Sequence, residues 1–169
     1  MHKQQQKGFF LVPARFAGCL LLSGLLISTI CRADSPLSPD PQLTPGDVLS
    51  TDASVICVPG YTKTVRNVSA AEKKQVYENY GIETRQPREY EVDHLISLEL
   101  GGSNEIANLW PESYITEPLN AHVKDQLENV LHGKVCAGEV PIDEAQRAIA
   151  SDWISAYQKY VGPLPDSRP

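Results

Sequence analysis

The stretch EVDHLISLELGGSNEIANLWPE, residues 91–112, decides the fold. Residues 91–100 alternate or run apolar without a breaker and end at Gly101-Gly102, which predicts a strand followed by a turn. Asn108-Leu109-Trp110 predicts a short second extended segment that stops at Pro111. Two short strands joined by a glycine-containing loop therefore form the centre of the expected fold.

A helix is predicted before this stretch, over residues 69–80. Ser69 and Glu72 have the spacing of a capping box, in which each residue satisfies a backbone N–H of the other. Gly81 stands where a helix commonly ends in a left-handed residue. Further upstream, the β-type runs 55–58 and 62–65 predict two short extended pieces.

Two more helices are predicted after the stretch. The first begins with Pro118 in its first turn, and the second runs from 142 to 160. The apolar face of the first is formed by Leu119, Val123, Leu127, Val130 and Leu131. Short strands flanked by helices predict an α+β fold.

The first 33 residues have the composition of a secretory signal peptide. Basic residues precede an uncharged apolar run over 16–30, and a small residue ends the segment at Ala33. Cleavage after Ala33 predicts an exported protein, periplasmic or extracellular, with no membrane segment in its mature form. An uncleaved anchor and a lipidated Cys31 are the alternatives.

The remaining chain is expected to have three parts. Residues 34–46 are rich in proline and without periodicity, which is typical of a tether or arm. A single folded domain is expected over 47–162, followed by a C-terminal tail over 163–169. The length suits one hydrophobic core.

Two cysteines remain in the mature chain, Cys57 and Cys136. In an oxidising compartment such a pair is most simply a disulfide, which contributes about 4 kcal/mol on the loop-entropy model. The alternative is a zinc site, because His132 and Cys136 are four positions apart. That site lacks an evident fourth ligand, and the sequence has no Cys-x-x-Cys motif.

The charge balance opposes strong binding to nucleic acid. The whole chain has a net charge of −6, and removing the signal peptide leaves 11 Lys and Arg against 21 Asp and Glu, a net charge of about −10. No basic residue lies between Arg88 and Lys124, so phosphate contacts are expected from outside this segment. Arg88 and Lys124 border the segment and are the chosen contacts, and the other candidates are Arg66, Arg85 and Lys134. Binding of nucleic acid is therefore expected to be weak and nonspecific.

The order of groups along the chain resembles a known nuclease family. Asp93-His94 lies on the first strand, Asn108 begins the second, and His122 follows on a helix. With NLWPE (108–112) and NAHVKDQLENVLH (120–132), this order is similar to the exported HNH-like branch of the ββα-metal nucleases, over most of the mature chain. The resemblance implies a ββα-metal motif packed with flanking helices. The disulfide would replace the zinc-binding cysteine pairs that the sequence lacks.

The resemblance also implies a role for each group. His94 would be the general base that activates water, and Asn108 would fix the loop and orient His94. Asp93 and His122 would hold a divalent metal ion, for which Mg, Mn, Ni and Zn are all compatible with the donors. The separation of Asn108 from His122 is longer than in compact HNH proteins, and Ser97 replaces an expected proline.

The expected function is an exported, metal-dependent, sequence-nonspecific endonuclease that hydrolyses phosphodiester bonds in DNA, with RNA not distinguished. The alternative is a non-catalytic exported protein on the same scaffold that binds a metal and a protein or envelope partner. Taken alone, His94 is more simply a strand histidine bonded to a neighbouring carboxylate. Its occurrence together with Asp93, Asn108 and His122 favours the catalytic role instead.

Overall fold

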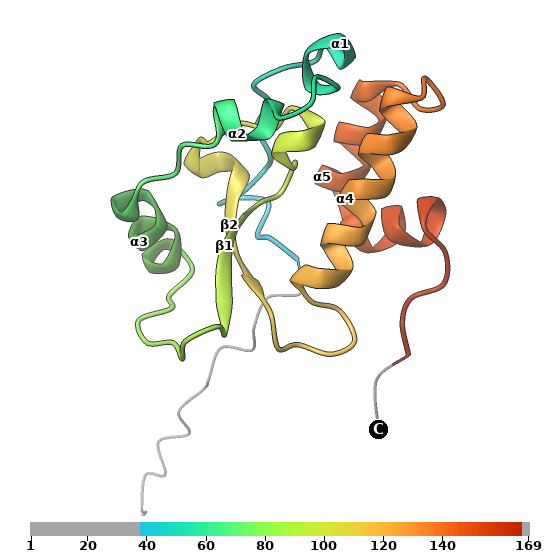
Figure 1. Cartoon of the computed structure of the whole chain (residues 1–169). Helices are drawn as coiled ribbons and strands as arrows, with labels where there is room; N and C mark the ends of the chain where they lie inside the picture. Colours follow the sequence, from blue (N-terminus) through green and yellow to red (C-terminus); the bar gives the residue numbers. More distant parts are fainter. Residues whose placement is uncertain (1–37, 167–169) are drawn as a thin grey trace, which may run out of the picture. The chain divides into compact units, whose positions relative to one another are not determined.

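The computed structural model describes residues 38–166, and the expected signal peptide lies outside these residues. Within them, helices surround a two-stranded antiparallel sheet, which confirms the α+β class (Figure 1). The elements in chain order are α1 (Ala53–Ile56), α2 (Tyr61–Val65), α3 (Ala70–Asn79), β1 (Tyr90–His94), the 3-10 turns η1 (Leu98–Leu100) and η2 (Ile106–Asn108), β2 (Leu109–Ser113), α4 (Ala121–Cys136) and α5 (Ile142–Tyr160).

The two strands pair with Asp93 opposite Trp110 and His94 opposite Leu109. Strand β1 ends at His94 and does not continue to residue 100 as predicted, because the chain turns into η1. The prediction that Pro111 stops the second strand is also wrong, since Pro111 lies within β2. A proline is tolerated there because β2 pairs on one side only, so its missing N–H interrupts no second ladder.

The two runs predicted as β-type are helices in the structure. The Asp52 carboxylate accepts a hydrogen bond of 2.8 Å from the Ser54 N–H and caps α1. Gly60 has a φ of 85° and starts α2 in a left-handed conformation that favours glycine. Local capping and a turn therefore override the β propensity of the valines and the isoleucine.

The predicted long helices are present. The capping box at the start of α3 is formed on both sides, and Gly81 follows the helix with a φ of 69°. Helix α5 has the predicted bounds but is interrupted at Asp152, whose carboxylate accepts from two backbone N–H groups in the next turn. Helix α4 begins at Ala121, so Pro118 precedes it.

Helix α4 packs along α5, whereas α3 packs against the hairpin (Figure 1). The core lies between α4, α5 and η1, with Leu127 and Leu131 of α4 fully buried against Ile149 of α5. This packing fixes α4 beside the carboxyl end of β1. No helix in the described part of the chain combines the length and apolarity that crossing a membrane requires.

Part of the expected arm is packed on the domain. Thr44 is buried, and its hydroxyl donates a hydrogen bond of 2.9 Å to the Leu109 carbonyl. The Gly46 N–H donates to the Ala107 carbonyl at 2.9 Å. Ordered contacts thus begin before residue 47, where the folded domain was expected to start.

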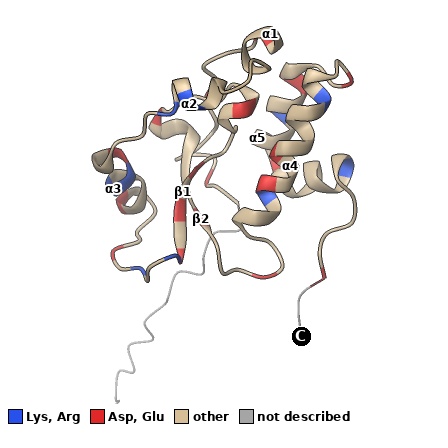
Figure 2. Ribbon diagram, in the orientation of Figure 1, with Lys and Arg blue, Asp and Glu red and all other residues tan. Residues whose placement is uncertain are grey.

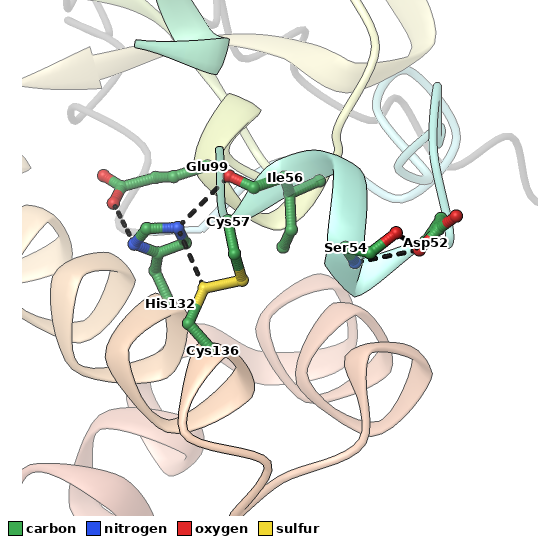
Figure 3. The surroundings of a disulfide bond; sticks show 7 residues. All are labelled: Asp52, Ser54, Ile56, Cys57, Glu99, His132 and Cys136. Carbon is green, nitrogen blue, oxygen red and sulfur yellow. Dashed lines mark hydrogen bonds and ion pairs between the residues drawn. A yellow bond between two sulfur atoms is a disulfide. The ribbon is translucent and has the colours of Figure 1, made fainter. Parts of the chain in front are cut away.

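The predicted disulfide between Cys57 and Cys136 is present, with the two Cα atoms 5.7 Å apart (Figure 3). It joins the end of α1 to the end of α4. Replacing both cysteines by serine is expected to lower the free energy of unfolding by about 2–5 kcal/mol, because the unfolded chain gains freedom. Urea unfolding of the oxidised protein and the double variant measures this difference, and a change below about 0.5 kcal/mol would contradict the expectation.

Candidate functional site

A cleft of about 350 Å³ lies where the end of β1 meets α4 and the segment after α1. Ionisable side chains from four parts of the sequence line it: Arg66, Asp93, His94, Glu99, Glu128 and His132. Acidic residues lie on β1 and α4, and basic residues lie near α2 and on α3 (Figure 2). The cleft therefore has the Arg66 guanidinium at its edge, next to a group of acidic side chains.

Asp93 and His94 point to opposite faces of β1, as successive strand residues do. Asp93 turns toward α4, where its carboxylate meets Lys124. His94 turns toward the loop after η1, where its ring meets Asn104. Both still border the cleft, because β1 ends at this point.

His94 is buried and held by an asparagine that the sequence analysis did not single out. Its Nε2 lies 3.2 Å from Oδ1 of Asn104, and Nδ2 of Asn104 donates to the Val65 carbonyl at 2.8 Å. Because Oδ1 can only accept, Nε2 carries the hydrogen and Nδ1 keeps a lone pair. Burial lowers the pKa of His94, although Asn104 and Asp93 oppose this, and the ring is neutral near pH 7.

Asn108 fixes the loop between the strands. It is fully buried, and its Oδ1 accepts from the Ile96 N–H at 2.9 Å. Its Nδ2 donates to the carbonyls of Ile96 at 3.0 Å and Ser103 at 2.8 Å. The loop is so tight that a Cβ on Gly102 would lie 1.7 Å from the Ile96 carbonyl oxygen. The side chain that contacts His94 is Asn104, however, and not Asn108.

Lys124, for which a phosphate contact was predicted, does not lie on the surface. The residue is fully buried, and its Nζ donates to Oδ2 of Asp93 at 2.6 Å and to the His94 carbonyl at 2.9 Å. It also pairs with Glu128, one turn further along α4. Sequence reasoning missed this because a lysine and a glutamate at i and i+4 are typical of an exposed helix face.

Four ionisable groups form what we call the Lys124 cluster: the partly buried Asp93 and the buried Glu112, Lys124 and Glu128. Burial alone would raise the pKa of Asp93, but the Lys124 ammonium holds it below its usual range. Burial raises the pKa of Glu112 well above its usual range and that of Glu128 to about 8. Near pH 7 the Lys124 ammonium therefore faces the Asp93 carboxylate, while burial favours the protonated forms of Glu112 and Glu128.

This arrangement predicts that stability falls with rising pH. Between pH about 4.5 and about 8, Glu128 keeps its proton in the folded chain but loses it in the unfolded chain. The contribution of Glu128 to the free energy of unfolding should therefore decrease over this window, by up to about 1.4 kcal/mol per pH unit. Urea unfolding at several pH values measures the slope, which Glu128→Gln should reduce and Glu78→Gln, on an exposed part of α3, should not. Equal slopes in both variants would contradict this assignment.

The structure does not bring His122 and Asp93 together. The His122 side chain is 70% exposed, and it contacts Asp125, with Nδ1 to Oδ2 at 3.9 Å, and the Tyr114 ring at 5.4 Å. His122 is two positions from Lys124, about 200° around the helix, so it points away when Lys124 points inward. The face of α4 that meets the cleft carries Glu128 and His132.

Of the candidate phosphate contacts, Arg66 lines the cleft and Arg88 does not. Arg88 is exposed at the start of the hairpin, five residues and about 17 Å along the chain from Asp93. Arg66 is also exposed, and it borders the cleft and an adjoining cavity of about 250 Å³ that His94 and Lys73 also line. Two exposed cations thus lie close to the buried histidine.

Cys57, His132 and Cys136 place their ligand atoms within 4.8 Å of one another, a group that could hold a metal ion. In the structure the two sulfur atoms are bonded to each other, so the predicted disulfide and the alternative zinc site occupy the same place. Within residues 38–166, no such group of three includes Asp93.

The comparisons with known proteins add no family or function to this geometry. No protein-family model matches the chain, and no curated protein or solved structure matches it significantly.

Proposed function

We propose that the chain is an exported, sequence-nonspecific endonuclease that hydrolyses phosphodiester bonds of DNA in the cleft beside β1. One observation carries the proposal: a buried neutral imidazole, His94, lies beside an exposed guanidinium, Arg66, in the same cleft. Hydrolysis of a phosphodiester requires a base for water and a cation for the phosphate. The resemblance to HNH-like nucleases supports the same reaction.

His94 would act as the general base through Nδ1. The Asn104 oxygen fixes the hydrogen on Nε2, so the lone pair of Nδ1 is available for a proton of water. As the water oxygen bonds to phosphorus, the bond from phosphorus to the leaving oxygen breaks and that oxygen takes a proton from solvent. Arg66 would hold the phosphate through charge-assisted hydrogen bonds.

The metal ligands implied by the resemblance do not fit the observed geometry. The Asp93 carboxylate is already neutralised by Lys124, and His122 faces Asp125 and Tyr114. We therefore assign no step to a metal ion on these two residues. Cleavage in the presence of Mg, Mn, Ni or Zn ions, compared with chelator alone, identifies any divalent ion that the reaction requires.

The second candidate is a non-catalytic binding protein on the same scaffold. The Lys124 cluster favours this candidate. Asp93, the acidic residue next to the candidate base His94, is already paired within the fold with Lys124, which also pairs with Glu128. Such a protein would use the cleft to bind a protein or envelope partner and would leave nucleic acid intact.

The test is cleavage of supercoiled plasmid DNA and of RNA by the oxidised chain 34–169. Each substrate is incubated with chelator alone and with Mg, Mn, Ni or Zn ions. Cleavage by the wild-type protein that His94→Ala abolishes supports the nuclease. Absence of cleavage under every condition contradicts the nuclease and favours the binding protein, whereas equal cleavage by His94→Ala contradicts the role of His94 as the base.

Activity is expected to fall steeply with monovalent salt. Arg66 and Lys73 offer about two phosphate contacts. A plot of the logarithm of the DNA-binding constant against the logarithm of the salt concentration should therefore have a slope of about −2. Arg66→Glu should weaken binding and reduce this slope by about 1, whereas Arg88→Glu, at the far end of β1, should change it less. Binding that is indifferent to salt, or a discrete cleavage pattern on plasmid, would contradict nonspecific recognition.

A further inference from the structure

The surroundings of His132 are those of a metal-binding histidine (Figure 3). Its Nε2 lies 3.4 Å from Sγ of Cys136 and 3.4 Å from the Ile56 carbonyl oxygen. Its Nδ1 lies 3.5 Å from Oε2 of Glu99. Glu99 and Ile56 present acceptor oxygens to the ring, and Cys136 presents a sulfur atom.

This orientation is the one found around zinc-bound histidines. A ligating imidazole commonly donates its other N–H to a carboxylate, which fixes the tautomer and makes the ligating nitrogen more basic. Glu99 is placed to accept a hydrogen bond from Nδ1. Nε2 lies beside Sγ of Cys136 and would bond to a metal ion through its lone pair, in place of its present contact with the Ile56 carbonyl oxygen. No fourth ligand to this site is evident in the sequence, whereas the fold adds Glu99 as a carboxylate that supports His132.

We propose that the reduced chain binds one zinc ion through Cys57, His132 and Cys136. A dithiol reductant would transfer two electrons and two protons to the disulfide and become a disulfide itself. Zinc would then displace the two thiol protons to solvent and bond to both thiolates and to Nε2. Two thiolates balance the charge of the ion, and a water molecule fills the fourth position, as in open Cys₂His sites.

The disulfide and the zinc ion are therefore alternative links between α1 and α4. The disulfide excludes the metal because its sulfur atoms carry no negative charge. The zinc form in turn protects the thiols from oxidation. This inference is independent of the proposed nuclease activity, since none of the three ligands has a role in that reaction.

The experiment titrates Co²⁺, as a spectroscopic probe for zinc, into chain 34–169 reduced with a phosphine under anaerobic conditions. Thiolate-to-cobalt charge transfer in the near ultraviolet is expected at one ion per chain, with displacement by Zn²⁺. The oxidised chain should lack this band. Absence of the band in the reduced chain, or the same band in the oxidised chain, overturns the proposal.

Variants separate a formed site from binding by thiols in an unfolded chain. His132→Ala and His132→Gln should weaken Zn²⁺ affinity at least tenfold, and Glu99→Gln should weaken it by up to tenfold. Asn129→Ala, at an exposed position one turn earlier on α4, is the matched control and should leave affinity unchanged. If both His132 variants bind as tightly as the wild type, the metal is held by unstructured thiols and the proposal is wrong.

Discussion

Lys124→Met is expected to lower the free energy of unfolding by about 3–5 kcal/mol, the cost of removing one partner from a buried ion pair. The methionine keeps much of the side-chain volume but leaves the Asp93 carboxylate without its ammonium partner. It also removes the hydrogen bond to the His94 carbonyl, which is 2.9 Å long. Asp93 must then take up a proton or admit water, and both cost stability.

The matched control is Lys134→Met, on the same helix, whose side chain is 35% exposed and pairs with Glu139 at 3.1 Å. A partly exposed pair of this kind is worth less than about 1 kcal/mol. Adding Asp93→Asn to Lys124→Met should restore part of the lost stability, because it removes the unpaired charge. Urea unfolding of the four proteins measures these differences, and equal losses in both lysine variants would show that Lys124 is not the centre of the cluster.

His94→Ala is expected to reduce nuclease activity by a factor of about 10² to 10⁴, the usual contribution of a general base. The rising limb of the pH–rate profile should lie below pH 6.5 in the wild type, because burial lowers the pKa of His94. This limb should disappear in the variant. Rates on plasmid DNA from pH 4.5 to 8 measure both effects, with circular dichroism to confirm the fold.

Two further variants distinguish the possible arrangements of the site. Asn104→Ala should reduce the rate less than His94→Ala and should shift the acid limb, because Asn104 positions the ring without touching the substrate. His122→Ala should lower activity only if the ligand set implied by the resemblance forms during the reaction. A His94→Ala protein with undiminished activity would remove His94 from the reaction altogether.

The helices could be predicted because their ends carry local information. The Ser69 and Glu72 capping box and the apolar spacing over 142–160 each fix a helix without reference to the rest of the chain. The segments 55–58 and 62–65 could not be predicted in this way. Their conformation depends on a cap from Asp52 and on a left-handed Gly60, and both outweigh the β propensity of a few residues.

The candidate site was predicted only in part. Asp93 and His94 were found because they are adjacent in the sequence and next to a recognisable loop. The α4 residues that meet them, Lys124 and Glu128, were missed because nothing local marks a charged pair as buried. The structure turns His132 and not His122 toward the cleft, although the resemblance implies His122 as the metal ligand.

The loop held by Asn108 allows the side chains at the rim of the cleft to change during evolution while the backbone path of the loop stays the same. A single carboxamide joins Ile96 to Ser103, and Gly102 admits no side chain, so these two positions determine the path of the backbone. Aspartate at 108 would have the right size but no hydrogen to offer the two carbonyls. Substitutions at the rim, such as at Glu99, could alter what the cleft accepts without rebuilding the loop beneath it.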